Sequence, residues 1–157
     1  MWEHFIEYLG FNNIYQGGRI TGFQFMIHIP YYRGVFISCI SDDFMVKVDD
    51  VNYTLDNVSI KIGDRVIPWS KIDASYDIFW PFGQKATVIV NKAGGLTPGL
   101  HKVECGFTVR KSYGTVYDPL QAQVGRGNLP KTVEEYDWKN NKQSSLQTCS
   151  EMLTLVM

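Results

Sequence analysis

The stretch ITGFQFMIHIP, residues 20–30, alternates apolar and polar side chains along its length. In an extended chain, successive side chains point to opposite faces, so a period of two places one set of residues on a single face. Gln24 and His28 fall on one face of this stretch. Four large apolar side chains fall on the other: Phe23, Phe25, Ile27 and Ile29. This pattern predicts a β-strand with one face in a hydrophobic core.

Two later stretches have the pattern of β-hairpins. In FMVKVDDVNYT, residues 44–54, the polar pair Asp49–Asp50 separates two short apolar runs. In VSIKIGDRVIPW, residues 58–69, Gly63–Asp64 has the same position. Asp and Gly are favoured in two-residue hairpin turns because these turns require positive φ angles. Both stretches therefore predict antiparallel strand pairs.

Further strands are expected in GVFISCIS (34–41), ATVIVNK (86–92) and LHKVECGFTVRKSY (100–113). Strands that recur about every ten residues with turns between them are typical of sandwiches. We therefore predict an all-β fold, a single-domain antiparallel β-sandwich of the jelly-roll-like kind, over residues 1–157. The expected strands of its core lie within residues 20–113.

Three segments outside this core have weaker patterns. Residues 2–10, WEHFIEYLG, place apolar side chains at helical spacing before Gly10, which predicts a helix, with an edge strand as the alternative. Residues 118–148 are polar and predict a long excursion without regular structure. Residues 149–157 are apolar again and predict a returning strand.

Composition excludes several classes of function. The net charge is −1, so no basic surface for nucleic acid or an anionic membrane is expected. The N-terminal dozen residues carry glutamates rather than the lysines of a signal peptide. Cys39, Cys105 and Cys149 lie far apart, which argues against a disulfide framework. We expect a protein of the cytoplasm.

Catalytic and metal-binding motifs are scarce in the sequence. No GxSxG, P-loop or GxGxxG motif occurs, and the three histidines are widely separated. Each histidine is expected at the surface or hydrogen-bonded within a strand, and no metal site or cofactor is predicted for this chain. Most aspartates are expected in solvated turns.

Four clusters have an unusual composition. Tyr31–Gly34, in the knuckle PYYRG, is either a plain bend or a contact surface, since tyrosine and arginine dominate interface hot spots. Residues 75–83, SYDIFWPFG, contain four aromatics and either form a surface or plug one end of the sandwich. Residues 94–101, GGLTPGLH, predict a structural corner. Residues 110–114, RKSYG, repeat the combination of cation and tyrosine.

In order and spacing, these motifs resemble the small β subunit of bacterial C-glycoside deglycosidases. The resemblance is carried by GFQF, PYYRG with Ser38 after it, KVDD at 47–50, WPFG at 80–83, GGLTPGLH and RKSYG. The resemblance covers residues 20–117, the family-like core. It implies a β-sandwich subunit that docks on a larger, metal-dependent barrel subunit. Together they would cleave the carbon–carbon bond between a 3-keto sugar and a flavonoid or other aromatic aglycone. The divalent metal, manganese in the usual case, and the main acid and base residues are implied on the larger subunit.

The knuckle and the other aromatic clusters are the expected contact surface. Arg33 is expected to pair with a carboxylate of the larger subunit, because a planar guanidinium suits bidentate contact. We expect Phe79 to be exposed beside this surface. The residues assigned to the subunit interface and the rim of the active site are Tyr31, Tyr32, Arg33, Gly34, Trp80, Phe82, Arg110 and Tyr113.

Two other classes remain open at this point. A free-standing carbohydrate-binding module is also an all-β domain, and Trp80 and Tyr76 would then stack on sugar faces. A self-sufficient glycosidase or lyase would need two carboxylates that meet only in space.

Overall fold

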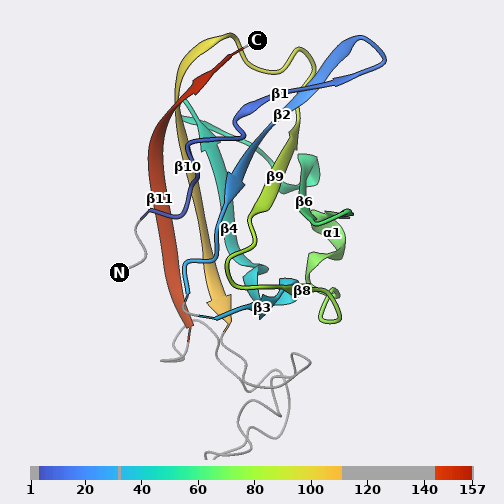
Figure 1. Cartoon of the computed structure of the whole chain (residues 1–157), viewed down its shortest axis with the longest axis vertical. Coiled ribbons are helices and arrows are strands. Elements are labelled where there is room, and N and C mark those ends of the chain that lie inside the picture. Colours follow the sequence, from blue (N-terminus) through green and yellow to red (C-terminus); the bar gives the residue numbers. More distant parts are fainter. Residues whose placement is uncertain (1–3, 32, 111–143, 157) are drawn as a thin grey trace, which may run out of the picture.

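The computed structural model describes residues 4–31, 33–110 and 144–156, and most of them lie in two antiparallel sheets (Figure 1). The five-stranded sheet has the order β1 (Asn12–Gln16), β2 (Arg19–Ile27), β9 (Ala86–Asn91), β6 (Val58–Ile62), β7 (Arg65–Pro68). The four-stranded sheet has the order β11 (Ser144–Leu155), β10 (Gly99–Arg110), β4 (Asp42–Val48), β5 (Val51–Asn52). The prediction of an all-β sandwich is confirmed.

Short elements connect the two sheets. A two-stranded ribbon joins β3 (Val35–Phe36) to β8 (Phe79–Trp80). Two 3-10 turns, η1 (Ile37–Ile40) and η2 (Leu55–Asn57), and the single helical turn α1 (Trp69–Ile72) complete the described chain.

The hydrophobic core lies between the sheets. The alternation in residues 20–30 sets the side of β2 that faces it: Phe23, Phe25 and Ile27 are fully buried, and Ile29 is 2% exposed. From the four-stranded sheet, Phe107 packs edge-on against Phe5, with ring centroids 5.3 Å apart. The other fully buried large side chains include Ile37, Ile40, Ile60, Ile72, Trp80, Leu153 and Leu155.

Both predicted hairpins are present. β4 pairs with β5 around Asp49 and Asp50, whose φ angles are 50° and 67°. β6 pairs with β7 around Gly63, whose φ is 58°, and Asp64. Positive φ at both central residues is the geometry of the type I′ turn, which matches the twist of the flanking strands. The residues of the first hairpin turn are therefore those that a tight hairpin needs.

The expected N-terminal helix is wrong, and the alternative of an edge strand is closer to the structure. Ile6 forms an isolated antiparallel bridge with Ile27. The Glu7 N–H donates to the Met26 carbonyl at 2.8 Å, and the His28 N–H donates to the Phe5 carbonyl at 2.9 Å. Helical spacing in so short a segment is outweighed by these bonds, which extend the five-stranded sheet at its edge.

The expected strand over residues 34–41 is also wrong beyond its first residues. β3 ends at Phe36, and the chain then turns through η1, in which all four residues are buried. A strand at a sheet surface exposes every second side chain. The run ISCI does not alternate between buried apolar and exposed polar side chains, because the whole turn lies inside the core.

The returning strand is confirmed, but it begins earlier than predicted. β11 starts at Ser144 and pairs with β10 through Leu155, so residues 144–148 do not belong to a polar excursion. Gln147 and Thr148 are polar residues within the strand. Thr148 is exposed, so the polar composition of this part reflects its solvent-facing side. The rest of the predicted excursion, residues 118–143, lies outside the described residues.

Cys39, Cys105 and Cys149 are buried free thiols, as the argument against a disulfide framework predicts. Burial raises the pKa of both Cys105 and Cys149. Within the described part of the chain, no helix has the length and apolar character needed to cross a membrane.

Candidate functional site: an aromatic surface at one end of the sandwich

The β3–β8 ribbon crosses the lower end of the sandwich, near the point where β10 ends (Figure 1). Val35 pairs with Trp80, and Phe36 pairs with Phe79. The Ile37 N–H donates to the Ile78 carbonyl at 2.8 Å and extends the pairing by one bond. The segment that follows the predicted knuckle is thus joined directly to the aromatic cluster at residues 75–83.

Gly34 allows this close approach of the two segments. A Cβ atom at this position would lie 2.5 Å from Cζ of Phe79 and 2.8 Å from the carbonyl oxygen of Trp80. Distances this short are not found for real Cβ atoms, so β8 would have to move to admit any side chain. The glycine of PYYRG is therefore required by packing against β8.

A tight turn follows β8 and is held by a buried tryptophan. The Gln84 N–H donates to the Pro81 carbonyl at 3.1 Å, and Gly83 has a φ of 89°, as a type II turn requires. Trp80 is fully buried, and its Nε1–H donates to the Gln84 carbonyl at 2.6 Å. The indole thereby fixes both ends of the turn. Phe82, between Pro81 and Gly83, is 57% exposed.

Three exposed aromatic side chains occur within residues 76–82. Tyr76 is 49% exposed, Phe79 is 47% exposed, and Phe82 is the most exposed of the three. Phe36 packs edge-on against Phe79, with centroids 5.2 Å apart, and holds that ring in place. We call Tyr76, Phe79 and Phe82 the aromatic surface. Exposed aromatic groups on a fixed backbone are typical of binding surfaces.

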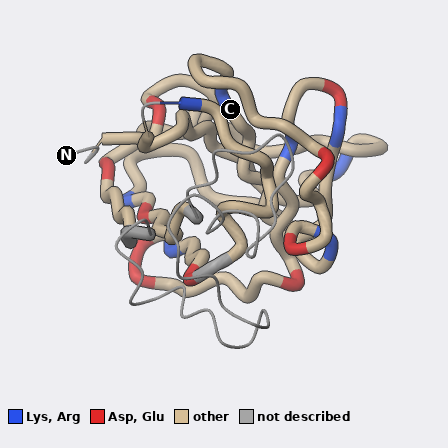
Figure 2. Tube along the Cα trace, turned by 90° about the horizontal axis from the view of Figure 1, so that it is seen from below, with Lys and Arg blue, Asp and Glu red and all other residues tan. Residues whose placement is uncertain are grey.

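Seen from this end, charged residues of both signs lie around the outline of the molecule (Figure 2). Some of the carboxylates have structural hydrogen bonds: the Ser41 hydroxyl donates to Asp73 at 3.0 Å, and the Thr108 hydroxyl donates to Asp43 at 2.9 Å. The exposed apolar surface at this end is formed by the aromatic side chains.

The predicted contact residues have different positions in the structure. The expected exposure of Tyr31 and Trp80 is wrong: Tyr31 is 6% exposed, and Trp80 is fully buried. Both side chains belong to the hydrophobic core, and the pairing of β8 with β3 turns Trp80 inward. Arg33 and Gly34 are partly buried, while Phe79 and Phe82 are exposed as expected.

The remaining predicted contact residues cannot be placed in this surface. Tyr32 and Tyr113 lie outside the described residues, and the Arg110 side chain is likewise not described, although its backbone ends β10. Burial of Trp80 also removes the tryptophan platform on which a carbohydrate-binding module would depend. Of the two residues expected to stack on sugars, Trp80 and Tyr76, Tyr76 alone is exposed.

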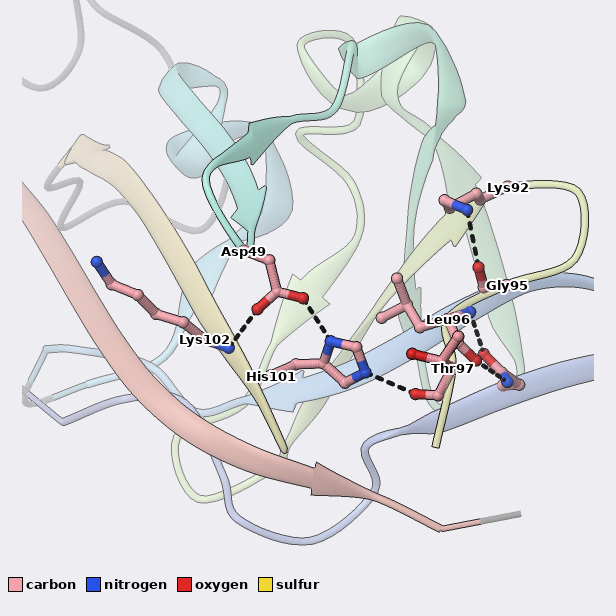
Figure 3. Close-up of polar contacts among 8 residues, drawn as sticks. Asp49, Lys92, Gly95, Leu96, Thr97, His101 and Lys102 are labelled. Atoms are coloured by element: carbon pink, nitrogen blue, oxygen red, sulfur yellow. Dashed lines mark hydrogen bonds and ion pairs between the residues drawn. The ribbon is translucent and has the colours of Figure 1, made fainter. Parts of the chain in front are cut away.

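The opposite end of the sandwich contains a chain of polar contacts (Figure 3). His101 is 7% exposed. Its Nδ1 lies 2.5 Å from Oδ2 of Asp49, and its Nε2 lies 2.6 Å from the Thr97 carbonyl. The other Asp49 oxygen accepts the Lys102 N–H at 2.9 Å. A carbonyl oxygen and a carboxylate are both acceptors, so this geometry favours a ring with protons on both nitrogens.

The protonation equilibria agree with this geometry. Burial by itself lowers the pKa of His101, but the hydrogen bonds to Asp49 and Thr97, together with the charge of Asp49, raise it above its ordinary value. The hydrogen bonds from His101 and from the Lys102 N–H hold the pKa of Asp49 below its ordinary value. The two side chains form an imidazolium–carboxylate pair at the hairpin turn.

The loop that precedes His101 is held by a second set of contacts (Figure 3). The Asn13 side chain donates to the Leu96 carbonyl at 2.8 Å and accepts the Leu96 N–H at 2.9 Å. The Lys92 ammonium donates to the Gly95 carbonyl at 2.9 Å. Gly95 has a φ of 59°, and a Cβ there would overlap the Asn13 amide. These contacts explain the requirement for glycine at position 95, and the prediction of a structural corner is confirmed.

Sequence reasoning anticipated part of this polar end. His101 was expected to be hydrogen-bonded within a strand or exposed, and the first of these is correct. Asp49 is an exposed turn residue, as expected, and it also binds a histidine 52 residues away, which was not expected. The sequence contained one signal for this contact: the motifs KVDD and GGLTPGLH, which contain Asp49 and His101, both belong to the set that carries the family resemblance.

Among residues 4–31, 33–110 and 144–156, no group of three or more His, Cys, Asp or Glu side chains is placed to hold a metal ion. The described contacts at both ends are structural or apolar. The fold and its surface thus define a class of protein: an antiparallel β-sandwich that presents exposed aromatic groups on a fixed turn.

Comparison with known proteins identifies the family within this class. A family model described as C-glycoside deglycosidase beta subunit matches residues 1–113. A C-glycoside deglycosidase beta subunit of Eubacterium cellulosolvens is 34% identical over 114 residues, which cover 72% of this chain and 77% of that protein. The chain belongs to the family of C-glycoside deglycosidase beta subunits. The match begins at residue 1 and so includes the segment that bridges to β2.

Proposed function

We propose that this chain is the small subunit of a cytoplasmic C-glycoside deglycosidase and docks through its aromatic surface onto a larger catalytic subunit. The observation that carries the proposal is Phe82, a large apolar side chain presented on a turn that a buried tryptophan holds. Ordering a side chain or a loop at an interface costs free energy, and a preorganised turn reduces that cost. Family membership supports the assignment to a subunit of this enzyme.

In the proposed complex, the larger subunit is a metal-dependent barrel that carries the acid and base residues and a divalent metal, manganese in the usual case. The substrate is a C-glycoside whose sugar has been oxidised at C3. The 3-keto group acidifies the neighbouring C–H bond, so proton abstraction, elimination of the aromatic aglycone and protonation of its carbon can follow. The small subunit contributes Phe79 and Phe82 to the rim of this site and limits access of water.

The test compares Phe82→Ala with Tyr15→Ala. Tyr15 lies in β1 and is 54% exposed, close to the 57% of Phe82, so it is a matched control for loss of an exposed aromatic ring. We expect Phe82→Ala to weaken binding of the larger subunit by about 2 kcal/mol or more, as truncation of a hot spot does. Tyr15→Ala should bind normally. Titration calorimetry gives the affinity, and turnover of a 3-keto C-glucoside gives the activity.

Equal affinity of the wild type and Phe82→Ala would contradict docking through this surface. Normal affinity with lost turnover would instead place Phe82 at the substrate. The isolated small subunit should show no turnover in any form, and turnover by this chain alone would contradict the division of roles between the subunits.

Arg33 tests the knuckle separately. We propose that its guanidinium pairs with a carboxylate of the larger subunit. Arg33→Ala should therefore weaken binding of the two subunits by roughly 2–5 kcal/mol. Arg33→Lys keeps the charge but loses the planar fork, so it should recover only part of the affinity. If Arg33→Ala binds the larger subunit as tightly as the wild type does, the pairing is wrong.

A further inference from the structure

β11 forms one edge of the four-stranded sheet, and among the described residues it pairs with β10 alone. Its register with β10 is continuous over residues 144–155, without a bulge. The sequence of the strand, SSLQTCSEMLTL, contains no proline, lysine or arginine. Bulges, prolines and lysines are the features with which proteins prevent a sheet edge from pairing. The edge of β11 lacks all three.

The pattern of hydrogen bonds determines which backbone groups this edge presents. The Asp49 N–H donates to the Lys102 carbonyl, so Lys102 directs its backbone polar groups toward β4. In an antiparallel sheet this direction alternates along a strand, so Cys105 directs its groups toward β11, where it faces Cys149. The residues of β11 that direct their N–H and C=O groups away from β10 are therefore Thr148, Ser150, Met152 and Thr154.

These outward backbone groups have no backbone partner in another described segment. The nearest such segment is the N-terminal one, and its contacts with β11 involve side chains. His4 Nδ1 lies 2.8 Å from a Glu151 carboxylate oxygen, and the Tyr8 hydroxyl donates to the other oxygen at 3.3 Å. The backbone of Phe5 and Ile6 lies near the Cys149 thiol and lowers its pKa, against the larger effect of burial. The segment thus contacts inward-facing side chains of β11.

Exposed apolar side chains border the same edge. Tyr8, which bonds Glu151, is 70% exposed, and Met152 is 51% exposed. Leu100, opposite Thr154 in the register, is 63% exposed, and Val156, directly after the strand, is 72% exposed. A strand-addition site has two components: backbone groups at a sheet edge that have no strand partner, and apolar surface beside them.

We propose that β11 is the pairing edge of a symmetric homodimer, in which it binds β11 of a second copy of this chain in antiparallel orientation. The two-fold axis passes beside Ser150. Outward backbone groups then meet outward backbone groups: Ser150 faces Ser150 of the second copy, and Thr148 faces Met152. Residues 145–155 are all paired in this register. An isologous contact of this kind closes on itself, so the β11 edge of each copy is used and cannot pair with a third copy.

Charge is the reason to choose a second copy as the occupant. Glu151 is the one charged residue of β11, and in this register it faces Cys149 of the second copy rather than another Glu151. Its carboxylate is already bound to His4 and Tyr8 within the same chain. Like charges therefore do not oppose each other, and no complementary charge is required. β11 lies along one side of the sandwich (Figure 1), so the aromatic surface of the lower end remains accessible in the dimer.

The experiment uses the purified full chain without the larger subunit, and sedimentation equilibrium measures its oligomeric state. We expect the wild type to be a dimer. Ser150→Lys places two cations directly opposite each other at the axis and should weaken the dimer at least about tenfold. Val66→Lys is the matched control, because Val66 is a 54% exposed residue of β7, at the edge of the other sheet. It should leave the dimer intact.

A mixture of Ser150→Lys and Ser150→Glu tests the register itself. At a protein concentration near the dissociation constant of the wild-type dimer, each variant alone should be mainly monomeric. The mixture should form a heterodimer, detectable by native mass spectrometry, because opposite charges now meet at the axis. Ser150 is exposed, and thermal unfolding of each variant checks that the fold is retained. A monomeric wild type, or a Ser150→Lys variant that still dimerises, would overturn the proposal. So would a monomeric wild type in which Ser150→Lys abolishes binding of the larger subunit, since β11 would then belong to that interface.

Discussion

The two ends of the sandwich are stabilised by different kinds of contact. At the lower end, aromatic rings pack on one another, and a single indole N–H fixes the turn that carries Phe82. At the opposite end, the side chains of Asn13, Lys92 and His101 bond to backbone carbonyls of one loop. The first arrangement leaves large apolar groups in solvent, whereas the second satisfies the polar groups of its own loop. This difference is why we place the docking surface at the lower end.

This comparison predicts that loss of one side chain lowers the free energy of unfolding more at the lower end than at the opposite, polar end. Trp80→Ala removes a fully buried ring and should lower the free energy of unfolding by about 3–5 kcal/mol. Trp80→Phe keeps most of the apolar volume but leaves the Gln84 carbonyl without the indole donor, so a smaller loss of about 1–3 kcal/mol is expected. Urea unfolding of the isolated chain measures both. Equal losses for the two variants would show that the hydrogen bond, rather than packing, dominates.

The next effect in size concerns the approach of β3 to β8. Gly34→Ala should cost about 1–3 kcal/mol, because the new methyl group overlaps the Phe79 ring and the Trp80 carbonyl. The same substitution in a Phe79→Ala background separates the two contacts. If the backbone carbonyl is the obstacle, most of the loss persists without the Phe79 ring. A fully relieved loss would identify the ring as the only obstacle and would contradict the requirement for glycine.

The sequence predicted the parts of the fold that depend on local patterns. The alternation at Phe23 and Phe25 and the Asp49–Asp50 turn are determined by neighbours within a few residues, so both could be predicted. The direction of Trp80 could not be predicted, because an aromatic run has the same composition whether it faces the core or the solvent. Burial of the ring depends on the pairing of β8 with Val35, which lies 45 positions earlier in the chain.

The candidate site was predictable in outline only. The aromatic run at residues 75–83 indicated the segment, and Tyr76, Phe79 and Phe82 proved to be its exposed members. The contact between His101 and Asp49 depends on the register of β4 against β10, which no short motif specifies. Helical spacing at residues 2–9 misled because the bridge between Ile6 and Ile27 outweighs the weak helix preference of a short segment.

At the polar end, Asn13→Ala should have a smaller effect than the substitutions at Trp80. It removes two hydrogen bonds to Leu96 and leaves a partly buried N–H and carbonyl without their partner, for a loss of about 1–2 kcal/mol. Asn13→Asp retains the acceptor for the Leu96 N–H and loses the donor, so it separates the two bonds. Chemical unfolding measures the stability of each variant. A loss as large as that of Trp80→Ala would contradict the ranking of the two ends.

The smallest expected effect is a pH dependence at the same end. The pKa of His101 is raised by its partners, so its contribution to stability is fully present below the ordinary value of 6.5 and is lost as pH rises through the raised pKa. The pKa of Asp49 is lowered, so its contribution is present above 3.8 and is lost as pH falls through the lowered pKa. The pair therefore stabilises the fold most between these two values.

His101→Gln tests this dependence, because a glutamine cannot gain a proton. The difference in free energy of unfolding between the wild type and His101→Gln should be largest near pH 5.5, inside the window set by 3.8 and 6.5, and should shrink as the pH rises into the alkaline range. Contributions from the other titrating groups largely cancel in this difference. Asp49→Asn should reduce the pH dependence in the same way, since it removes the carboxylate that raises the pKa of His101. A difference that stays constant over this range would mean that folding does not shift the pKa of His101, and a difference that grows as the pH rises would mean that folding lowers it. Either result would contradict the imidazolium–carboxylate pair.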